Sequence, residues 1–218
     1  MSKIRVVGWL LVMVLLVHSS AALAEFDLSL FKNDSRFNVK EDVMNDTITI
    51  EIVDAESGTG LGTAGENAVI AVFTDIKLAS KNLVPPTMRM ILYYRGEDWV
   101  FVDTFILKTS KNRYTFKTLE GSRNVLSGGL VSEQITIPLT DESLPMIKDI
   151  LDDSFGTVST VMVDYRISGD RYVDGTIVYL SAEGLRSLYD TYVAAGGLDL
   201  DFSDMNTLYP VEVKSMTD

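Results

Sequence analysis

The stretch Thr47-Ile48-Thr49-Ile50-Glu51-Ile52 decides the fold class. Its isoleucines alternate with Thr and Glu, so that every second side chain faces the same side, as in a half-buried β-strand. Further short runs rich in β-branched and aromatic residues follow, separated by turn residues. They cover residues 68–76, 88–94, 99–107, 113–118, 131–137, 158–167 and 172–180. This rhythm predicts antiparallel strands arranged as a sandwich or a meander.

Two segments have helical spacing instead. In the first, apolar residues from Leu144 to Leu151 follow Thr140–Ser143, whose side chains supply capping oxygens. The second begins at Ser181, places Leu185, Leu188 and Tyr192 among others on one face, and ends at Gly196-Gly197. We therefore expect an α+β fold that is predominantly antiparallel β, with about two amphipathic helices. Residues 25–218 should form a single domain, and Glu25–Asp46 should be an irregular lead-in or an added edge strand.

Residues 1–24 have the pattern of a secretory signal peptide. Lys3 and Arg5 precede an apolar run from Val6 to Val17, and Ala22-Leu23-Ala24 offers small residues for cleavage before Glu25. The run is too short to cross a bilayer, for which about twenty apolar residues are needed. We expect an exported mature chain without a membrane span.

Composition narrows the class of protein. The formal net charge of −12 gives no electrostatic basis for binding nucleic acid. The chain has no cysteine, and its one histidine, His18, lies in the predicted signal peptide. A chain of this length can be held by its core without disulfides, which favours a bacterial periplasmic or secreted protein. The lack of imidazole and thiol in the mature chain favours a non-catalytic protein, and we expect no cofactor.

Three patterns carry recognisable chemistry but have simpler interpretations. Gly60–Gly65 matches the dinucleotide fingerprint G-x-G-x-x-G, but a strand rather than a helix is predicted after it, so we interpret it as an inter-strand loop. Asp199–Asn206 is rich in oxygen ligands but lacks the glycine and glutamate of an EF-hand, which leaves a solvated turn or an irregular calcium site. Acidic residues at the predicted turns, such as Asp98 and Asp170, favour local hydrogen bonding over glycoside hydrolysis.

Residues 94–104 and 165–176 echo each other. In both, Tyr-Arg is followed by Gly and Asp, and an aromatic residue then opens the next run. We interpret them as two similar β-hairpins, with an internal duplication as the alternative. The YRGEDW hairpin (94–99) and the RISGDRY turn (166–172) resemble a pattern of uncharacterised exported bacterial β-rich domains. This resemblance implies no activity.

One charge asymmetry has two interpretations, of which the protection of a strand edge is preferred. Basic residues gather at Lys108, Lys111, Arg113, Lys117 and Arg123, where they either protect a strand edge from pairing or bind an anionic partner. We select Lys111, Arg113, Lys117 and Trp99 as candidate partner-binding residues. The leading hypothesis is a non-catalytic exported domain that binds a protein or an envelope component. The alternative is a carbohydrate-binding or carbohydrate-active protein, in which Trp99, Tyr94 or Tyr172 stacks on sugar rings.

Overall fold

The computed structural model describes residues 28–35, 37–52, 60–63, 69–79, 86–117, 119–153, 161–179 and 182–216. The predicted signal peptide, residues 1–24, lies outside the described residues. The chain divides into two compact units, Met1–Leu30 and Phe31–Asp218. Apart from the first residues of helix α2 (Ser29–Lys32), all described elements belong to the second unit.

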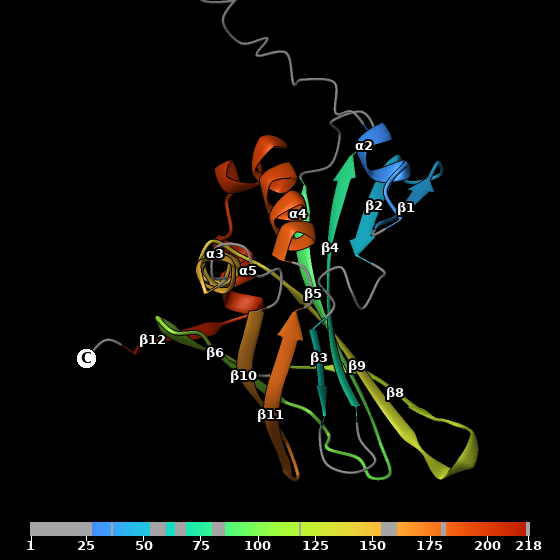
Figure 1. Cartoon of the computed structure of the whole chain (residues 1–218), viewed down its shortest axis with the longest axis vertical. Coiled ribbons are helices and arrows are strands. Elements are labelled where there is room, and N and C mark those ends of the chain that lie inside the picture. Colours follow the sequence, from blue (N-terminus) through green and yellow to red (C-terminus); the bar gives the residue numbers. More distant parts are fainter. Residues whose placement is uncertain are drawn as a thin grey trace, which may run out of the picture. The chain divides into compact units, whose positions relative to one another are not determined.

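Twelve strands in the described residues form the body of Phe31–Asp218 (Figure 1). They are β1 (Phe37–Asp42), β2 (Thr47–Ile52), β3 (Gly60–Thr63), β4 (Val69–Ala79), β5 (Thr87–Gly96), β6 (Thr104–Lys108), β7 (Asn112–Phe116), β8 (Gly121–Val125), β9 (Val131–Pro138), β10 (Val161–Ser168), β11 (Tyr172–Tyr179) and β12 (Val211–Ser215). Besides α2, the helices in the described residues are α3 (Pro145–Asp152), α4 (Ala182–Ala194) and α5 (Ser203–Leu208), with short 3-10 turns at Ser127–Gly129 and Gly197–Asp199.

The strands pair in the order β12-β7-β6-β10-β11-β3-β4-β5-β9-β8, and every pairing is antiparallel. Strand β4 is a branch point. Along one edge it pairs with β5, while the other edge is shared by β3 at residues 69–72 and by β2 at residues 75–79. Two antiparallel sheets therefore share β4, and β1 extends the second sheet by pairing with β2.

The predicted fold class is confirmed. In β5 every second side chain is buried, namely Met88, Met90, Leu92 and Tyr94, as the alternating pattern requires. Helix α3 begins at Pro145, where the missing N–H removes no helical hydrogen bond. Helix α4 buries Leu185, Leu188 and Tyr192 and is followed by Gly196 in the left-handed conformation, with φ of 81°.

Several strands differ from the prediction. The lead-in provides β1, the added edge strand that was one of its two expected forms. Gly60–Thr63, by contrast, was interpreted as part of a loop and forms β3 between β4 and β11. Strand β8 has no alternating apolar pattern and is exposed throughout, whereas β12 alternates Val211 and Val213 with Glu212 and Lys214 but is nearly all exposed. Strand β8 forms by local pairing with β9, where Val125 is opposite Val131. Strand β12 forms by pairing with β7, which lies far earlier in the chain, and local hydrophobicity does not record that long-range effect.

Buried tyrosines make the fold sensitive to alkali. Burial raises the pKa of Tyr165 and of Tyr192 to about 12, and it also raises the pKa of Tyr114. Because these folded-state pKa values exceed the unfolded value of about 10, the stabilisation is complete below pH 10 and is lost as the pH rises through 12. We expect the near-ultraviolet circular dichroism to show cooperative unfolding in this window.

A substitution of Tyr192 tests whether the ionisation of buried tyrosines causes the alkaline unfolding. Its hydroxyl donates to the carbonyl oxygen of Gly197 at 2.8 Å, and its ring is fully buried. In Tyr192→Phe one fewer proton is released on alkaline unfolding. The free energy of unfolding should then fall less steeply with pH, by up to about 1.4 kcal/mol per pH unit. An unchanged slope would contradict the assignment.

Candidate functional site

The four residues selected from the sequence lie in two parts of the fold. Lys111 occupies the turn between β6 and β7, Arg113 lies in β7, and Lys117 follows it. Trp99 lies in the segment between β5 and β6. Strand β7 is paired on both sides, with β6 and with β12, so the interpretation of its basic residues as guards of a free edge is wrong. In the described sheet, β12 is the edge at this end.

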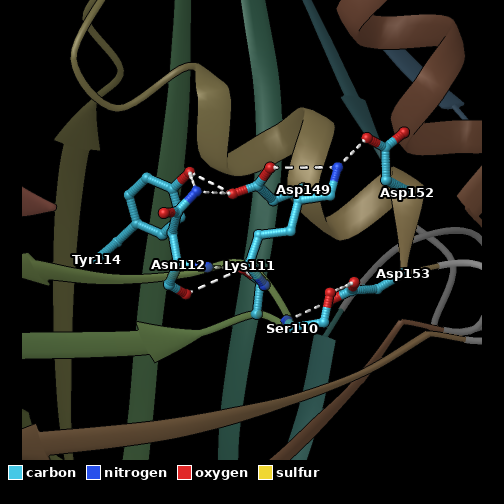
Figure 2. A network of polar contacts seen from close by, with 8 residues as sticks. Ser110, Lys111, Asn112, Tyr114, Asp149, Asp152 and Asp153 are labelled. Atoms are coloured by element: carbon cyan, nitrogen blue, oxygen red, sulfur yellow. Dashed lines mark hydrogen bonds and ion pairs between the residues drawn. The ribbon is translucent and has the colours of Figure 1, made fainter. Parts of the chain in front are cut away.

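The turn before β7 is attached to helix α3 through a buried carboxylate (Figure 2). The Asn112 side-chain amide and the Tyr114 hydroxyl both donate to Asp149 Oδ2, at 2.7 and 2.6 Å. Asp149 is only 7% exposed and Tyr114 is fully buried. Burial is the main cause of the raised pKa of Tyr114, and the hydrogen bond to Asp149 adds to it. The phenol therefore remains protonated and acts as a donor.

Two further acids at the end of α3 bind the same turn (Figure 2). Lys111 Nζ lies 2.5 Å from Asp152 Oδ2 and 3.9 Å from Asp149 Oδ1. Ser110 donates its backbone N–H to Asp153 at 2.9 Å and its hydroxyl to the same carboxylate. Carboxylates at a helix C-terminus oppose the helix dipole, so they need donors such as these. Lys111 therefore serves an internal contact. The ion pair lowers the pKa of Asp152 and raises that of Lys111.

Arg113 belongs to a row of three cations. Lys214 on β12 is opposite Arg113 on β7, and Arg113 is opposite Lys108 on β6. Residues directly opposite in antiparallel strands point to the same face, so the three side chains form one exposed row. None of them makes an ion pair with a described residue. We call Lys108, Arg113 and Lys214 the basic row; Lys117, by contrast, is paired with Glu212 at 2.7 Å.

Trp99 does not open a strand, because β6 begins only at Thr104. Its half-buried ring lies 5.8 Å from the ring of Phe101, at an interplanar angle of 34°. Phe101 is 41% exposed and has φ of 56°, a left-handed conformation that bulky residues rarely adopt. The guanidinium of Arg123 on β8 lies 5.1 Å from the centre of the Phe101 ring, which is a cation–π distance.

A buried glutamate holds this segment. Glu133 on β9 is 1% exposed. Its Oε1 accepts the backbone N–H groups of Val100 and Phe101 at 2.7 and 2.8 Å, and its Oε2 accepts that of Val102 at 2.9 Å. Arg123 Nε completes the site, 3.3 Å from Oε2. One carboxylate thus accepts hydrogen bonds from three successive backbone N–H groups that have no acceptor on a neighbouring strand. Arg123 balances the charge of this carboxylate.

The two echoed segments touch each other but differ in structure. Residues 161–179 form the hairpin β10–β11, whereas β5 and β6 do not pair, so the hairpin interpretation is wrong for residues 94–104. The turn of the hairpin packs on the other segment: Asp170 N–H donates to Val100 O at 3.0 Å, and Arg171 Nη2 donates to Tyr94 OH at 2.6 Å. At Gly169 a Cβ would lie 2.1 Å from Phe101 O, so only glycine allows this approach.

The other sequence patterns have local structural roles. Gly60–Thr63 is a strand, and Ala64-Gly65 lie outside the described residues. Asp201 accepts the Ser203 N–H at 3.0 Å, just where α5 begins. Asp98 and Asp174 pair with Arg171 and Arg166. Within the described ranges no cluster of three or more acidic or histidine side chains is placed to hold a metal ion, and no helix is long and apolar enough to cross a membrane.

No family model matches this chain. Neither a curated protein nor a solved structure matches it. Of the aromatic residues proposed to stack on sugars, Tyr94 is fully buried with its hydroxyl bonded to Asp98 O at 2.9 Å, whereas Tyr172 is 67% exposed. Tyr94 therefore belongs to the core, and Trp99 and Tyr172 are the members of that set that reach the surface.

Glu133 and Asp149 were missed by the sequence analysis. The sequence does contain an indication of Glu133, because this residue occupies an inward-facing position in the alternating run Val131, Glu133, Ile135, Ile137. An acid at such a position predicts a buried carboxylate that needs donors. The indication of Asp149 in the sequence is weaker, because Asp149 lies beside the predicted apolar stripe of α3 and its hydrogen-bond partners are 35 and 37 residues away.

Proposed function

We propose that this protein is an exported, non-catalytic domain that binds an anionic partner, a protein or an envelope component, through the basic row. The observation that supports this proposal is the register of Lys108, Arg113 and Lys214 on three adjacent strands. Their cationic groups share one exposed face and have no ion pair with a described residue. Carboxylates or phosphates of a partner would complete these pairs.

In an acidic chain, a row of three cations without an ion pair to a described residue is unexpected. The chain has 31 acidic and 19 basic residues, so acids are abundant. Elsewhere in the described residues lysines form ion pairs with these acids: Lys32 pairs with Glu41, and Lys40 pairs with Glu51. Like charges opposite each other on neighbouring strands destabilise a sheet. Asp164 on β10 is opposite Lys108, and Glu212 attracts Arg113 and Lys214, but none of these contacts is an ion pair between described residues. The row is therefore only partly compensated within the fold, and the acids of an external partner would complete it.

The basic row can be tested with two matched double variants. Arg113→Gln/Lys214→Gln removes two charges from the row, and Lys32→Gln/Lys40→Gln removes two charges from internal ion pairs. We expect the first to weaken capture of an anionic envelope fraction, and of poly-glutamate beads, by about tenfold, since each exposed ion pair contributes up to about 1 kcal/mol. Its thermal stability should be unchanged or higher, because repulsion is relieved.

Salt dependence provides the second measurement. Exposed charges are screened over about 8 Å at physiological ionic strength, so capture by the parent protein should weaken as NaCl is raised. The control Lys32→Gln/Lys40→Gln should bind as the parent does. Equal losses in both variants would show a general charge effect, and capture that is unchanged in the row variant at every salt concentration would exclude the basic row as the binding face.

A further inference from the structure

Phe101 keeps an unfavourable backbone conformation at the surface. Its φ of 56° is disfavoured for any residue with a Cβ, and glycine or asparagine would adopt it more readily. The residue is nevertheless 41% exposed, so burial accounts for only part of the preference for a phenylalanine there. Conformations of this kind persist only where the surroundings enforce them, and they cluster at ligand sites.

The surroundings do enforce it, from two sides. The Glu133 carboxylate fixes the backbone of residues 100–102 from within the sheet, and the backbone of Gly169 packs against the carbonyl oxygens of Val100 and Phe101. The backbone that carries the Phe101 ring is therefore held in place, and the Trp99 ring lies beside it with the ring centres 5.8 Å apart. Such preorganisation lowers the entropy lost when a ligand binds.

The backbone of this loop is not free to recognise a ligand. The N–H groups of residues 100–102 bond to Glu133, and that of Asp103 donates to Ser168 O at 3.0 Å. Addition of a peptide strand needs free backbone donors and acceptors, so that mode is not offered at residues 100–103. Recognition here must use ring faces and the Arg123 guanidinium, whose Nη atoms donate no hydrogen bond to a described residue.

The charge balance beside the two rings indicates which class of ligand would bind there. The Arg123 cation is balanced by the Glu133 carboxylate 3.3 Å away, so the two rings lie beside a neutral pair. A ligand suited to this surface has an apolar face for the rings and neutral hydroxyl groups for the guanidinium. We propose that Trp99, Phe101 and Arg123 form a binding site for a neutral saccharide, separate from the basic row. We call these three residues the aromatic platform.

Trp99 itself can report on this binding. The chain has two tryptophans, so Trp9→Phe in the full chain leaves Trp99 as the sole indole. The probes are soluble neutral polysaccharides, namely a β-glucan, a mannan and a xylan, together with chitin oligosaccharides. We expect at least one probe to change the Trp99 fluorescence saturably, because a sugar that covers the ring excludes water. Since the pair is neutral, the affinity should be the same in low and high NaCl.

Phe101→Gly separates binding from folding. Glycine adopts the observed φ without strain, so the melting temperature should be equal to or above that of the parent, while saccharide affinity should fall by about tenfold or more with the loss of one stacking ring. Tyr172→Ala, which removes an exposed aromatic residue outside the platform, should bind as the parent does.

Three results would overturn the proposal. One is the absence of a fluorescence response with every saccharide probe. Another is a response that persists in Phe101→Gly. A third is photo-crosslinking from position 101 that captures a polypeptide and is not competed by saccharide, since the platform would then bind protein. The Arg113→Gln/Lys214→Gln variant should retain saccharide binding, so failure of the basic row and failure of the platform are distinguishable.

Discussion

Glu133→Ala is expected to lower the free energy of unfolding by about 3 to 5 kcal/mol. The substitution leaves the backbone N–H groups of residues 100–102 without their acceptor and Arg123 without its counter-charge. Because Glu133 is 1% exposed, water cannot take its place without opening the sheet. Urea denaturation of the parent and the variant, followed by circular dichroism, measures the loss.

Two further variants locate the source of this effect. Glu133→Gln keeps one acceptor oxygen but loses the charge, so it should fall between the parent and Glu133→Ala. Gln134→Ala changes the adjacent, exposed position and should shift stability by at most about 0.5 kcal/mol. If Glu133→Ala cost less than 1 kcal/mol, the loop would be held mainly by the Gly169 turn, and its fixed orientation would need another cause.

Local sequence patterns were sufficient to predict the strands and helices that bury only one side. The residues predicted from the alternation at Thr47–Ile52 coincide with β2, and the helical stripe after Ser181 is α4. In both elements burial follows the sequence period, because the core contacts every second or every third to fourth side chain. The class of fold and the two longer helices could be predicted on this basis.

The candidate sites could not be predicted in full, because they depend on which strands become neighbours. The basic row exists only because β12 pairs with β7, and the contact between Lys117 and Glu212 joins residues 95 positions apart. Strand β12 alternates apolar and polar residues only at Val211 and Val213 and is almost wholly exposed, so its short pattern did not identify it. The prediction therefore grouped Lys111, Arg113 and Lys117 by sequence proximity, whereas the structure gives an internal pair to Lys111 and to Lys117 and leaves Arg113 with Lys108 and Lys214.

The attachment of the β6–β7 turn to helix α3 is the second feature with a large expected effect. Asp149→Ala should lower the free energy of unfolding by about 2 to 4 kcal/mol. It removes the acceptor of the Tyr114 hydroxyl and of the Asn112 amide, and Tyr114 is fully buried, so its donor would have no partner. Asp152→Ala is the matched control, since it removes an exposed carboxylate of the same helix end and should leave stability close to that of the parent.

A double-mutant cycle tests whether the loss of stability in Asp149→Ala comes from the Tyr114 hydroxyl. Tyr114→Phe removes the hydroxyl and keeps the ring, so in this background Asp149→Ala no longer strands a buried phenol donor. The two substitutions together should therefore cost less than the sum of their separate effects, with a coupling free energy of about 1 to 2 kcal/mol. Additive losses would mean that Asp149 acts through Asn112 and Lys111 alone. In that case the Asn112 hydrogen bond and the charge of Lys111 would carry the attachment, and the share that Lys111 contributes would weaken with salt.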